Sequence, residues 1–505
     1  MNLRSASIAD VVRLGCVALL SAGLFVMVGC GGGSSSSSGG GTTITVSVSP
    51  ATVNLALGAQ TQFTATVSGT SNTAVTWEVN GVTGGSSTTG TISSTGDYTA
   101  PATLPSSSVT VMAVSQADTT VSGSATVNFP VNNTQALQVN MGPGNNYGPN
   151  GLFTDVTVCV PGTSSCQDIQ NVLVDTGSYG LRLLSSEVTE ITLPETTDST
   201  GDVLQECVAF ADGSYTWGQV ATADIGMAGE KASGVPLQII SASESVGPST
   251  CASGTNSNTV QALGANGILG IGPFQQDCGA ACASSSPPAQ YYLCPNSACS
   301  PATVALASQL QNPVWLFTQD NNGVLISLPA VPGAGAVSAS GSMIFGIGTQ
   351  SDNALGSAQI YTADGCGQIS TTFNGTTYSD TSSSCMGGTF FDTGSQGLYI
   401  LDSAALNNIP ECMDVPPFYC PTSTVSFMAT NTGANGTKAA VSFNVANADT
   451  LFSSNNAVFN NLAGANVGNT GSFDWGLPFF LGRNVFVGIE NQNSPTGVAG
   501  PYWAF

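Results

Sequence analysis

Alternation of apolar and polar positions dominates the sequence just after residue 42. Apolar side chains recur at every second position in the runs 45–50, 62–67, 74–79 and 108–113. This period predicts strands with one buried face, and turn residues separate them at a spacing typical of a β-sandwich. We therefore predict an all-β domain over residues 43–132, serving either as a stalk or as an adhesion module.

From residue 133 the apolar runs end in a motif that occurs twice. Residues 172–174 lead into Asp175-Thr176-Gly177-Ser178, and residues 389–391 lead into Asp392-Thr393-Gly394-Ser395. Both copies continue as Gly-Leu-x-(Leu/Ile)-Leu. The duplication predicts one lobe used twice, with one carboxylate from each lobe at a shared cleft. We place the lobes at 133–312 and 313–505.

Shorter patterns complete the prediction for the two lobes. Residues 210–218 form a hairpin candidate, and the runs 220–225, 234–240 and 314–317 predict strands. An apolar-apolar-Gly triplet follows each motif, first as Ile268-Leu269-Gly270 and then as Phe480-Leu481-Gly482.

The first 42 residues differ in composition from the rest. Residues 1–29 contain two arginines and a short apolar run, as a signal peptide does, and a Gly/Ser tether follows over 30–42. Met27-Val28-Gly29-Cys30 is similar to the bacterial lipobox, which predicts that Cys30 carries a lipid and is the only membrane attachment. An ordinary signal peptide with a chance cysteine is the alternative.

Charge and composition exclude several kinds of chemistry. The net charge of −23 opposes binding to nucleic-acid phosphates. The chain has no histidine, which excludes Ser-His-Asp and Cys-His catalysis and histidine metal ligation. Hydrolytic chemistry must then depend on carboxylates, and we predict no cofactor.

An even number of cysteines lies beyond residue 42. In an exported chain twelve cysteines predict about six disulfides, for which Cys159/Cys166, Cys366/Cys385 and Cys412/Cys420 are close neighbours. The alternative is a metal site at Cys278-x3-Cys282 and Cys294-x4-Cys299. We expect disulfides and no metal.

The order of these motifs resembles that of the pepsin-like aspartic peptidases, in particular their bacterial lipoprotein relatives. Trp77 and residues 96–101 similarly resemble bacterial immunoglobulin-like repeats. The resemblance implies an all-β chain, with an immunoglobulin-like sandwich before a bilobal fold. It also implies these site residues: Asp175 and Asp392 as catalytic; Thr176, Gly177, Ser178, Thr393, Gly394 and Ser395 as supporting; and Phe210, Asp212, Gly213 and Tyr215 as flap candidates.

Three departures from that family's pattern bear on activity. Phe210 stands where the flap usually has tyrosine, and Arg182 stands where tryptophan is common. Arg483 follows the second apolar-apolar-Gly triplet. A cation near two carboxyls would lower their pKa and oppose proton sharing, whereas arginines that point outward or pair with surface acids would have no such effect.

Two neighbouring carboxyls share one proton and can act as base and acid together. We therefore expect a monomeric, exported, lipid-anchored aspartic endopeptidase that acts on polypeptides. The alternative is an idle fold of the same kind that binds other proteins in the cell envelope.

Overall fold

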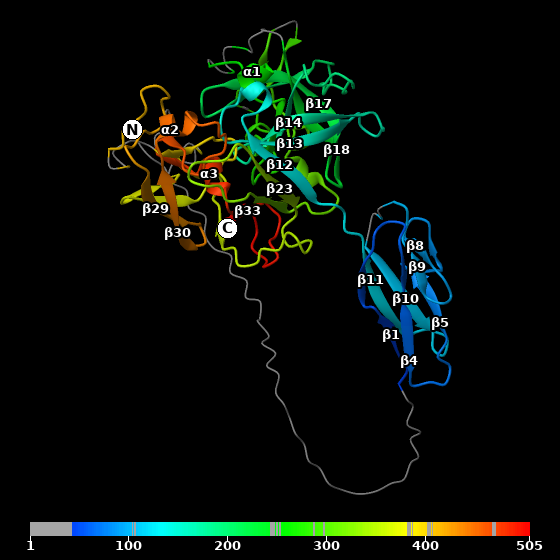
Figure 1. Cartoon of the computed structure of the whole chain (residues 1–505). Helices are drawn as coiled ribbons and strands as arrows, with labels where there is room; N and C mark the ends of the chain where they lie inside the picture. The colour runs from blue at the N-terminus through cyan, green and yellow to red at the C-terminus, as the bar shows by residue number, and fades with distance from the viewer. Residues whose placement is uncertain are drawn as a thin grey trace, which may run out of the picture. The chain divides into compact units, whose positions relative to one another are not determined.

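The structure is a computed structural model. It describes residues 43–505 apart from 104, 106–107, 243–247, 249–250, 252–253, 286–287, 296–297, 381–384, 386, 401–405, 407 and 467–470. The predicted signal peptide, tether and lipidated Cys30 lie outside the described residues. The chain divides into two compact units, Met1–Phe129 and Pro130–Phe505, whereas the sequence had suggested a division after residue 132. The relative placement of the two units in Figure 1 is not determined.

The first unit consists of three small sheets around one core. Their strand orders are β1-β4, β2-β11-β10-β5-β6 and β3-β9-β8-β7. Val109, Val111 and Ala113 alternate inward along β10 and are fully buried beside Trp77, so the period-2 pattern is confirmed there. The strands are β1 (Thr45–Ser49), β2 (Thr52–Asn54), β3 (Gln60–Gln62), β4 (Thr64–Ser68), β5 (Val75–Val79), β6 (Val82–Thr83), β7 (Gly85–Ser86), β8 (Gly90–Ile92), β9 (Asp97–Thr99), β10 (Val109–Ser115) and β11 (Ser122–Asn128).

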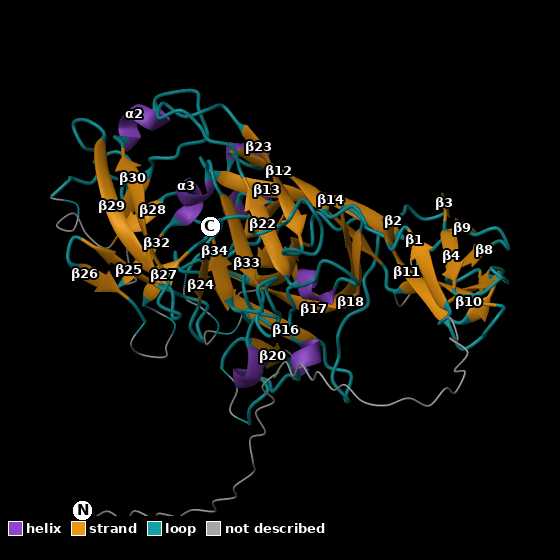
Figure 2. Ribbon diagram, turned by 90° about the horizontal axis from the view of Figure 1, so that it is seen from below, coloured by secondary structure: helices purple, strands orange, loops and turns teal. Residues whose placement is uncertain are grey.

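The second unit is also mostly β and has two regions joined by a continuous sheet. One long sheet runs in the order β21-β20-β16-β17-β18-β15-β19-β14-β13-β12-β23-β22-β33-β34-β24. Figure 2 shows β12, β22 and β33 between the region of β16–β18 and the region that contains β28–β32. The second region adds two smaller sheets, β26-β25-β29-β30 and β27-β32-β28-β31.

The elements of the second unit follow in chain order. The strands before the second motif are β12 (Thr134–Asn140), β13 (Gly151–Cys159), β14 (Cys166–Asp175), β15 (Tyr179–Leu184), β16 (Leu204–Ala209), β17 (Tyr215–Met227), β18 (Glu230–Ile240), β19 (Gly267–Ile271), β20 (Tyr291–Leu293), β21 (Ser300–Pro301), β22 (Gly323–Ser327), β23 (Ala339–Phe345), β24 (Ile360–Thr362), β25 (Ser370–Phe373), β26 (Thr376–Tyr378) and β27 (Gly388–Phe390). The later strands are β28 (Leu398–Ile400), β29 (Val425–Thr432), β30 (Lys438–Val445), β31 (Ala463–Ala465), β32 (Ser472–Asp474), β33 (Asn484–Gly488) and β34 (Tyr502–Ala504). The α-helices are α1 (Val260–Leu263), α2 (Ala448–Phe452) and α3 (Gly476–Phe480), and the 3₁₀ helices are η1 (Pro143–Asn145), η2 (Gly279–Ala281), η4 (Leu306–Ser308) and η5 (Pro313–Leu316).

The predicted duplication is visible in the strand pairing. In the first lobe β14 pairs in parallel with β19, β19 antiparallel with β15, and β15 in parallel with β18. In the second lobe β27, β32, β28 and β31 repeat this order and these directions. Each motif therefore follows a strand that lies in an equivalent four-strand arrangement.

The pairing corrects the second apolar-apolar-Gly triplet. The strand beside the second motif is β32, which continues into Asp474-Trp475-Gly476, whereas Phe480-Leu481-Gly482 lies at and beyond the end of α3. Gly476 and Gly270 are the equivalent glycines. A Cβ on Gly270 would lie 2.4 Å from the backbone N of Tyr179, and one on Gly476 would lie 2.0 Å from the backbone O of Gly397. Both positions therefore require glycine because another strand passes too closely.

Two other element predictions also change. Residues 314–317 were predicted as a strand, but Pro313–Leu316 forms a 3₁₀ helix. Pro313 fits the first helical turn because it has no N–H, and the side chain of Asn312 caps the backbone N of Val314. The predicted strand at 220–225 is part of one longer strand, β17, which continues directly from the hairpin.

Six disulfides form in the described part of the chain, as the sequence predicted. The three close pairs are confirmed, and the cysteines of the alternative metal site form two of the remaining disulfides. The pairs are Cys159–Cys166, Cys207–Cys251, Cys278–Cys282, Cys294–Cys299, Cys366–Cys385 and Cys412–Cys420. They indicate an oxidising compartment. Among the described residues, no helix combines the length and apolar character needed to span a bilayer.

Candidate active site

The two motif loops hold each other through a symmetric set of hydrogen bonds. The Thr393 hydroxyl accepts from the backbone N of Thr176 (3.1 Å) and donates to the carbonyl of Val174 (2.7 Å). The Thr176 hydroxyl accepts from the backbone N of Thr393 (3.0 Å) and donates to the carbonyl of Phe391 (2.6 Å). Both threonines are buried. Losing either hydroxyl would leave buried backbone groups unsatisfied, so the two loops are fixed relative to one another.

This interlock brings Asp175 and Asp392 together. A hydrogen bond joins their side chains. A Cβ added to Gly177 would lie 3.0 Å from Asp392 Oδ1 and 3.2 Å from Asp175 Oδ1, and one on Gly394 would meet the same two oxygens at 3.1 and 3.0 Å. The motif glycines are thus needed because a side chain there would occupy the space of the carboxyls.

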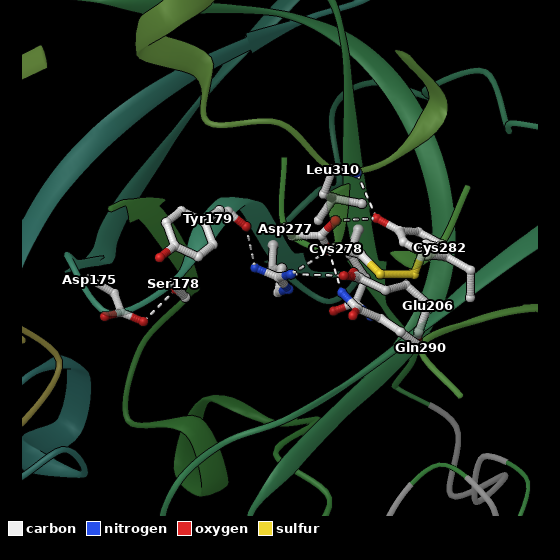
Figure 3. Close-up of polar contacts among 12 residues, drawn as sticks. Asp175, Ser178, Tyr179, Glu206, Asp277, Cys278, Cys282, Gln290 and Leu310 are labelled. Atoms are coloured by element: carbon white, nitrogen blue, oxygen red, sulfur yellow. Dashed lines mark hydrogen bonds and ion pairs between the residues drawn. A yellow bond between two sulfur atoms is a disulfide. The ribbon is translucent and has the colours of Figure 1, made fainter. Parts of the chain in front are cut away.

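Each carboxyl receives equivalent support from its own loop. Asp175 accepts from the backbone N of Gly177 (2.8 Å) and from the Ser178 hydroxyl (2.5 Å), the contact drawn in Figure 3. Asp392 accepts from the backbone N of Gly394 (2.7 Å) and from the Ser395 hydroxyl (2.8 Å). The Oδ2 atom of each aspartate is therefore held by a serine hydroxyl, whereas the two Oδ1 atoms face each other.

Electrostatics favour one proton on this pair. Burial raises the pKa of Asp392 well above its ordinary value, and the charges of Asp175 and Asp474 raise it further. The hydrogen bond from Ser395 acts in the opposite direction. The pair therefore favours a state with one shared proton, which is the acid-plus-base combination that amide hydrolysis requires.

The predicted hairpin is confirmed, but its side chains do not all face the pair of carboxyls on Asp175 and Asp392, which we call the dyad. β16 and β17 pair antiparallel, and the turn closes where the backbone N of Phe210 donates to the carbonyl of Ser214 (2.8 Å). Phe210 packs near Tyr147 and Phe153. Tyr215 is buried in a separate cluster with Trp217 beside Cys207.

The remaining two flap candidates lie in the turn itself. Asp212 accepts hydrogen bonds from the backbone N and the hydroxyl of Ser214 (2.8 and 2.7 Å). Its charge also contributes to the raised pKa of Tyr147 and Tyr399. Gly213 has φ +84°, a conformation in which glycine closes the turn without strain.

Tyr147, which the sequence did not single out, lies next to both carboxyls. Its hydroxyl donates to the carbonyl of Gly394, and the side chain of Gln396 donates to the carbonyl of Tyr147. Burial, followed by the charges of Asp392 and Asp175, raises its pKa well above the usual value. The segment between β12 and β13 thus crosses the Asp392 loop and contributes a phenol to the site.

Arg182 is buried rather than at the surface, contrary to the predicted alternatives. Its guanidinium contacts Glu206 at 2.7 Å and Asp277 at 3.2 Å, and donates to the carbonyl of Tyr179 (2.8 Å). Burial opposes its charge, but the two carboxyls outweigh that effect and raise its pKa. Figure 3 shows Glu206, Asp277 and Gln290 close together, separated from Asp175 by Tyr179. The charge of Arg182 is thus compensated locally.

Arg483 also lies away from the dyad. Its guanidinium stacks 4.6 Å from the centre of the Phe479 ring and donates to the carbonyl of Phe479 (2.5 Å). Burial lowers its pKa. Arg483 therefore binds the end of α3 and is not among the charges that raise or lower the pKa of Asp392.

A cavity of about 210 Å³ lies beside the first motif. Thr176, Gly177 and Tyr179 line one side of it, and Gln368 and Phe390 belong to the other lobe. The space next to the motif is thus bounded by both halves of the unit. Two groups of metal-ligand residue types, Cys366/Asp380/Cys385 and Cys412/Cys420/Asp449, contain disulfide-bonded cysteines, which leaves no thiolate there for a metal.

Asp474 and Tyr399 are the other site residues that sequence reasoning missed. Asp474 lies opposite both Phe390 and Tyr399 in the pairing of β32. The signal was present, because Trp475-Gly476 is itself an apolar-Gly pair, but the acidic residue before it breaks the expected apolar pattern. Tyr399 occupies the same position in its lobe as Arg182 does in the first, so aligning the two motifs would have identified it.

Comparison with other proteins gives three findings. Curated proteins provide no match. Among solved structures, the aspartic proteinase from Irpex lacteus is similar, with 16% sequence identity, a TM-score of 0.42, and coverage of 74% of this chain and 96% of that one. Residues 129–505 match a family described as "Protein of unknown function (DUF3443)". Since this match spans most of the sequence, the chain belongs to the DUF3443 family.

Proposed function

We propose that the unit formed by residues 130–505 is an aspartic-type endopeptidase. The observation that carries the proposal is the carboxyl pair, in which Asp175 and Asp392 are hydrogen-bonded to each other and supported by matching hydroxyl and amide donors. Two carboxyls this close cannot both ionise easily, so one proton is shared between them.

The proposed reaction uses one ionised and one protonated carboxyl. The ionised carboxylate takes a proton from water as the water oxygen attacks the peptide carbonyl carbon, and the protonated acid gives its proton to the carbonyl oxygen. The carboxyl that took the water proton then passes it to the nitrogen as the C–N bond breaks, and the other carboxylate takes back a proton from a hydroxyl of the tetrahedral product as the new carboxylic acid forms. Asp175 and Asp392 end the cycle with the single proton with which they began.

The proposal extends to polypeptide substrates, and residues of both lobes line the cavity beside the first motif. The six disulfides suit an exported protein. We extend the proposal to a monomer that is attached to the cell envelope by a lipid on Cys30, with the first unit as its stalk. Mass spectrometry of the mature N-terminus tests the lipid.

The decisive experiment measures cleavage of fluorescein-labelled casein between pH 3 and 7. We expect activity in the wild-type chain, sensitivity to a pepstatin-type inhibitor, and loss of at least about a hundredfold in both Asp175→Asn and Asp392→Asn. Thermal unfolding checks that each variant remains folded. Cleavage that survives in both folded variants would refute the assignment.

A second function, an idle fold that binds polypeptides, is favoured by one residue. Phe210 stands at the flap position and has no hydroxyl that could orient water or substrate. This function predicts no cleavage at any pH, together with casein binding that Asp175→Asn leaves unchanged.

A further inference from the structure

The Tyr179 hydroxyl is a hydrogen-bond donor that is left free at the cavity beside the first motif. Tyr179 begins β15, directly after Ser178, and lines the cavity of about 210 Å³ together with Thr176 and Gly177. It is half-buried, and within the described part of the chain no group accepts a hydrogen bond from its phenol. A phenol placed in this way can donate to a molecule that enters the cavity.

The ring of Tyr179 is held in place by the protein itself. Arg182 Nη1 donates to the Tyr179 carbonyl (2.8 Å), and the ring meets Phe274 edge-on, with 5.4 Å between the ring centres. A Cβ on Gly272 would lie 2.5 Å from Tyr179 Cε1, so glycine at that position leaves the space that the ring occupies. Because backbone and ring are both held, little conformational entropy is lost when the hydroxyl binds a ligand.

Arg182 is anchored on its other side by two carboxyls. Its Nη2 atom lies 2.7 Å from Glu206 Oε1 and 3.2 Å from Asp277 Oδ2, and all three side chains are buried. Asp277 accepts two further side-chain hydrogen bonds, one at each carboxyl oxygen. In Figure 3 Tyr179 lies between these two carboxyls and Asp175. One guanidinium thus joins a buried ion-pair cluster to the backbone of Tyr179, a bridge that the single nitrogen of a lysine cannot reproduce.

Three carboxyls act on the phenol at the junction of the lobes. Burial raises the pKa of Tyr179, and the charges of Asp175, Glu490 and Asp392 raise it further. Asp175 belongs to the first lobe, whereas the other two belong to the second. Tyr179 therefore remains a donor wherever the dyad holds one proton, and its negative surroundings favour a neutral acceptor over an anion. A main-chain carbonyl is such an acceptor.

Among the described residues, the other aromatic residues of the site are less well placed to meet a ligand in this cavity. Phe210 at the flap position has no hydroxyl, and the Tyr147 hydroxyl already donates to the carbonyl of Gly394. Tyr399 on β28 is not among the residues that line the cavity. Tyr179 thus provides the free phenol that the flap lacks.

We propose that Tyr179 is a substrate-positioning residue, whose hydroxyl donates a hydrogen bond to a main-chain carbonyl of a bound polypeptide, and that Arg182 holds Tyr179 in position for this contact. This inference deepens the proposed peptidase function and rests on it. A polypeptide held at such a carbonyl lies in the cavity that borders Thr176 and Gly177.

The first test measures kcat and KM for cleavage of fluorescein-labelled casein in wild type and Tyr179→Phe, which loses only the hydroxyl. We expect KM to rise about three- to tenfold, as the loss of one hydrogen bond to substrate requires, with a smaller change in kcat. Tyr502→Phe is the matched control, because it removes another hydroxyl that has no partner, in a cluster with Leu325 and Phe486. The control should leave both constants unchanged. A KM for Tyr179→Phe within about twofold of wild type overturns the proposal.

The role of Arg182 is tested by a double-variant cycle. Arg182→Lys keeps the positive charge but cannot join both carboxyls to the Tyr179 carbonyl, and thermal unfolding checks that it remains folded. It should raise KM in the wild-type background and leave KM unchanged in the Tyr179→Phe background. Increases in KM that multiply in the double variant would show that Arg182 does not act through the phenol. Tyr179→Phe keeps every contact of Arg182, so the first test does not depend on the folding of Arg182→Lys.

A second measurement does not require activity. Fluorescence anisotropy of labelled casein gives its Kd for the Asp392→Asn chain, with and without Tyr179→Phe, and we expect the added substitution to weaken binding about three- to tenfold. If the wild type cleaves casein but Tyr179→Phe changes neither KM nor Kd, the inference on Tyr179 fails alone. If no chain cleaves casein but Tyr179→Phe weakens its binding, the contact with the polypeptide exists and the peptidase function is what fails.

Discussion

Glu230 and Asp320 form a second carboxyl pair, away from the dyad, whose effect on stability can be worked out. Glu230 lies at the start of β18 and is 4% exposed, and Asp320 is 5% exposed. Burial, then the charge of Asp320 and a hydrogen bond to it, raises the pKa of Glu230 to about 8. The side chain of Gln350 donates to Asp320 (2.5 Å). Glu230 and Asp320 would repel each other if both were ionised, so the contact between them is stable only while one of them is protonated.

The sign of the pH effect follows from proton binding. Below about pH 4.5 Glu230 is protonated in both the folded and the unfolded chain and contributes no slope. Between that value and about pH 8 the unfolded chain releases the proton while the folded one keeps it, so stability falls as pH rises. The shift of about 3.5 pH units corresponds to at most about 5 kcal/mol above pH 8.

Glu230→Gln should remove this slope, because its amide donates to Asp320 at every pH. Relative to wild type we expect little change in the free energy of unfolding near pH 4.5 and a gain of about 3–5 kcal/mol at pH 8.5. Urea unfolding of the full chain at half-unit pH steps measures it. Glu190→Gln, at an exposed residue, is the control for loss of one charge. If wild type and Glu230→Gln lose stability in parallel as pH rises, Glu230 is not held protonated.

Two further substitutions test the framework of the site. Arg182→Met leaves two buried carboxyls without a cation and should lower the free energy of unfolding at pH 7 by about 3–5 kcal/mol in urea, with a smaller loss at pH 4; a loss below about 1 kcal/mol would contradict the buried ion pairs. Thr393→Val removes the hydroxyl that joins the two motif loops and should cost about 2–4 kcal/mol and most of the casein cleavage, whereas Thr393→Ser keeps the hydroxyl and should restore both. A Thr393→Val chain as stable and as active as wild type would contradict the role of the hydroxyl.

The duplicated motif shows where sequence reasoning succeeds. Two matching stretches predicted two lobes with one acid each, and the repeated order of β14, β19, β15 and β18 in the second lobe agrees with it. The period of a strand is a local property of the sequence and the number of cysteines is a property of the whole chain. Neither prediction requires knowing which residues are in contact. The error at Phe480-Leu481-Gly482 arose because a triplet of residue types fits more than one place, and only strand register distinguishes them.

The sequence by itself determined the residue types that can perform chemistry here: paired aspartates, no histidine, and a chain rich in strands. Only the tertiary structure decided which other groups surround them. Tyr147 reaches Gly394 and Arg182 meets Asp277 through loops and strand registers that bring distant segments together. Such contacts leave no period in the sequence, because each depends on one side chain and on the packing of the whole unit.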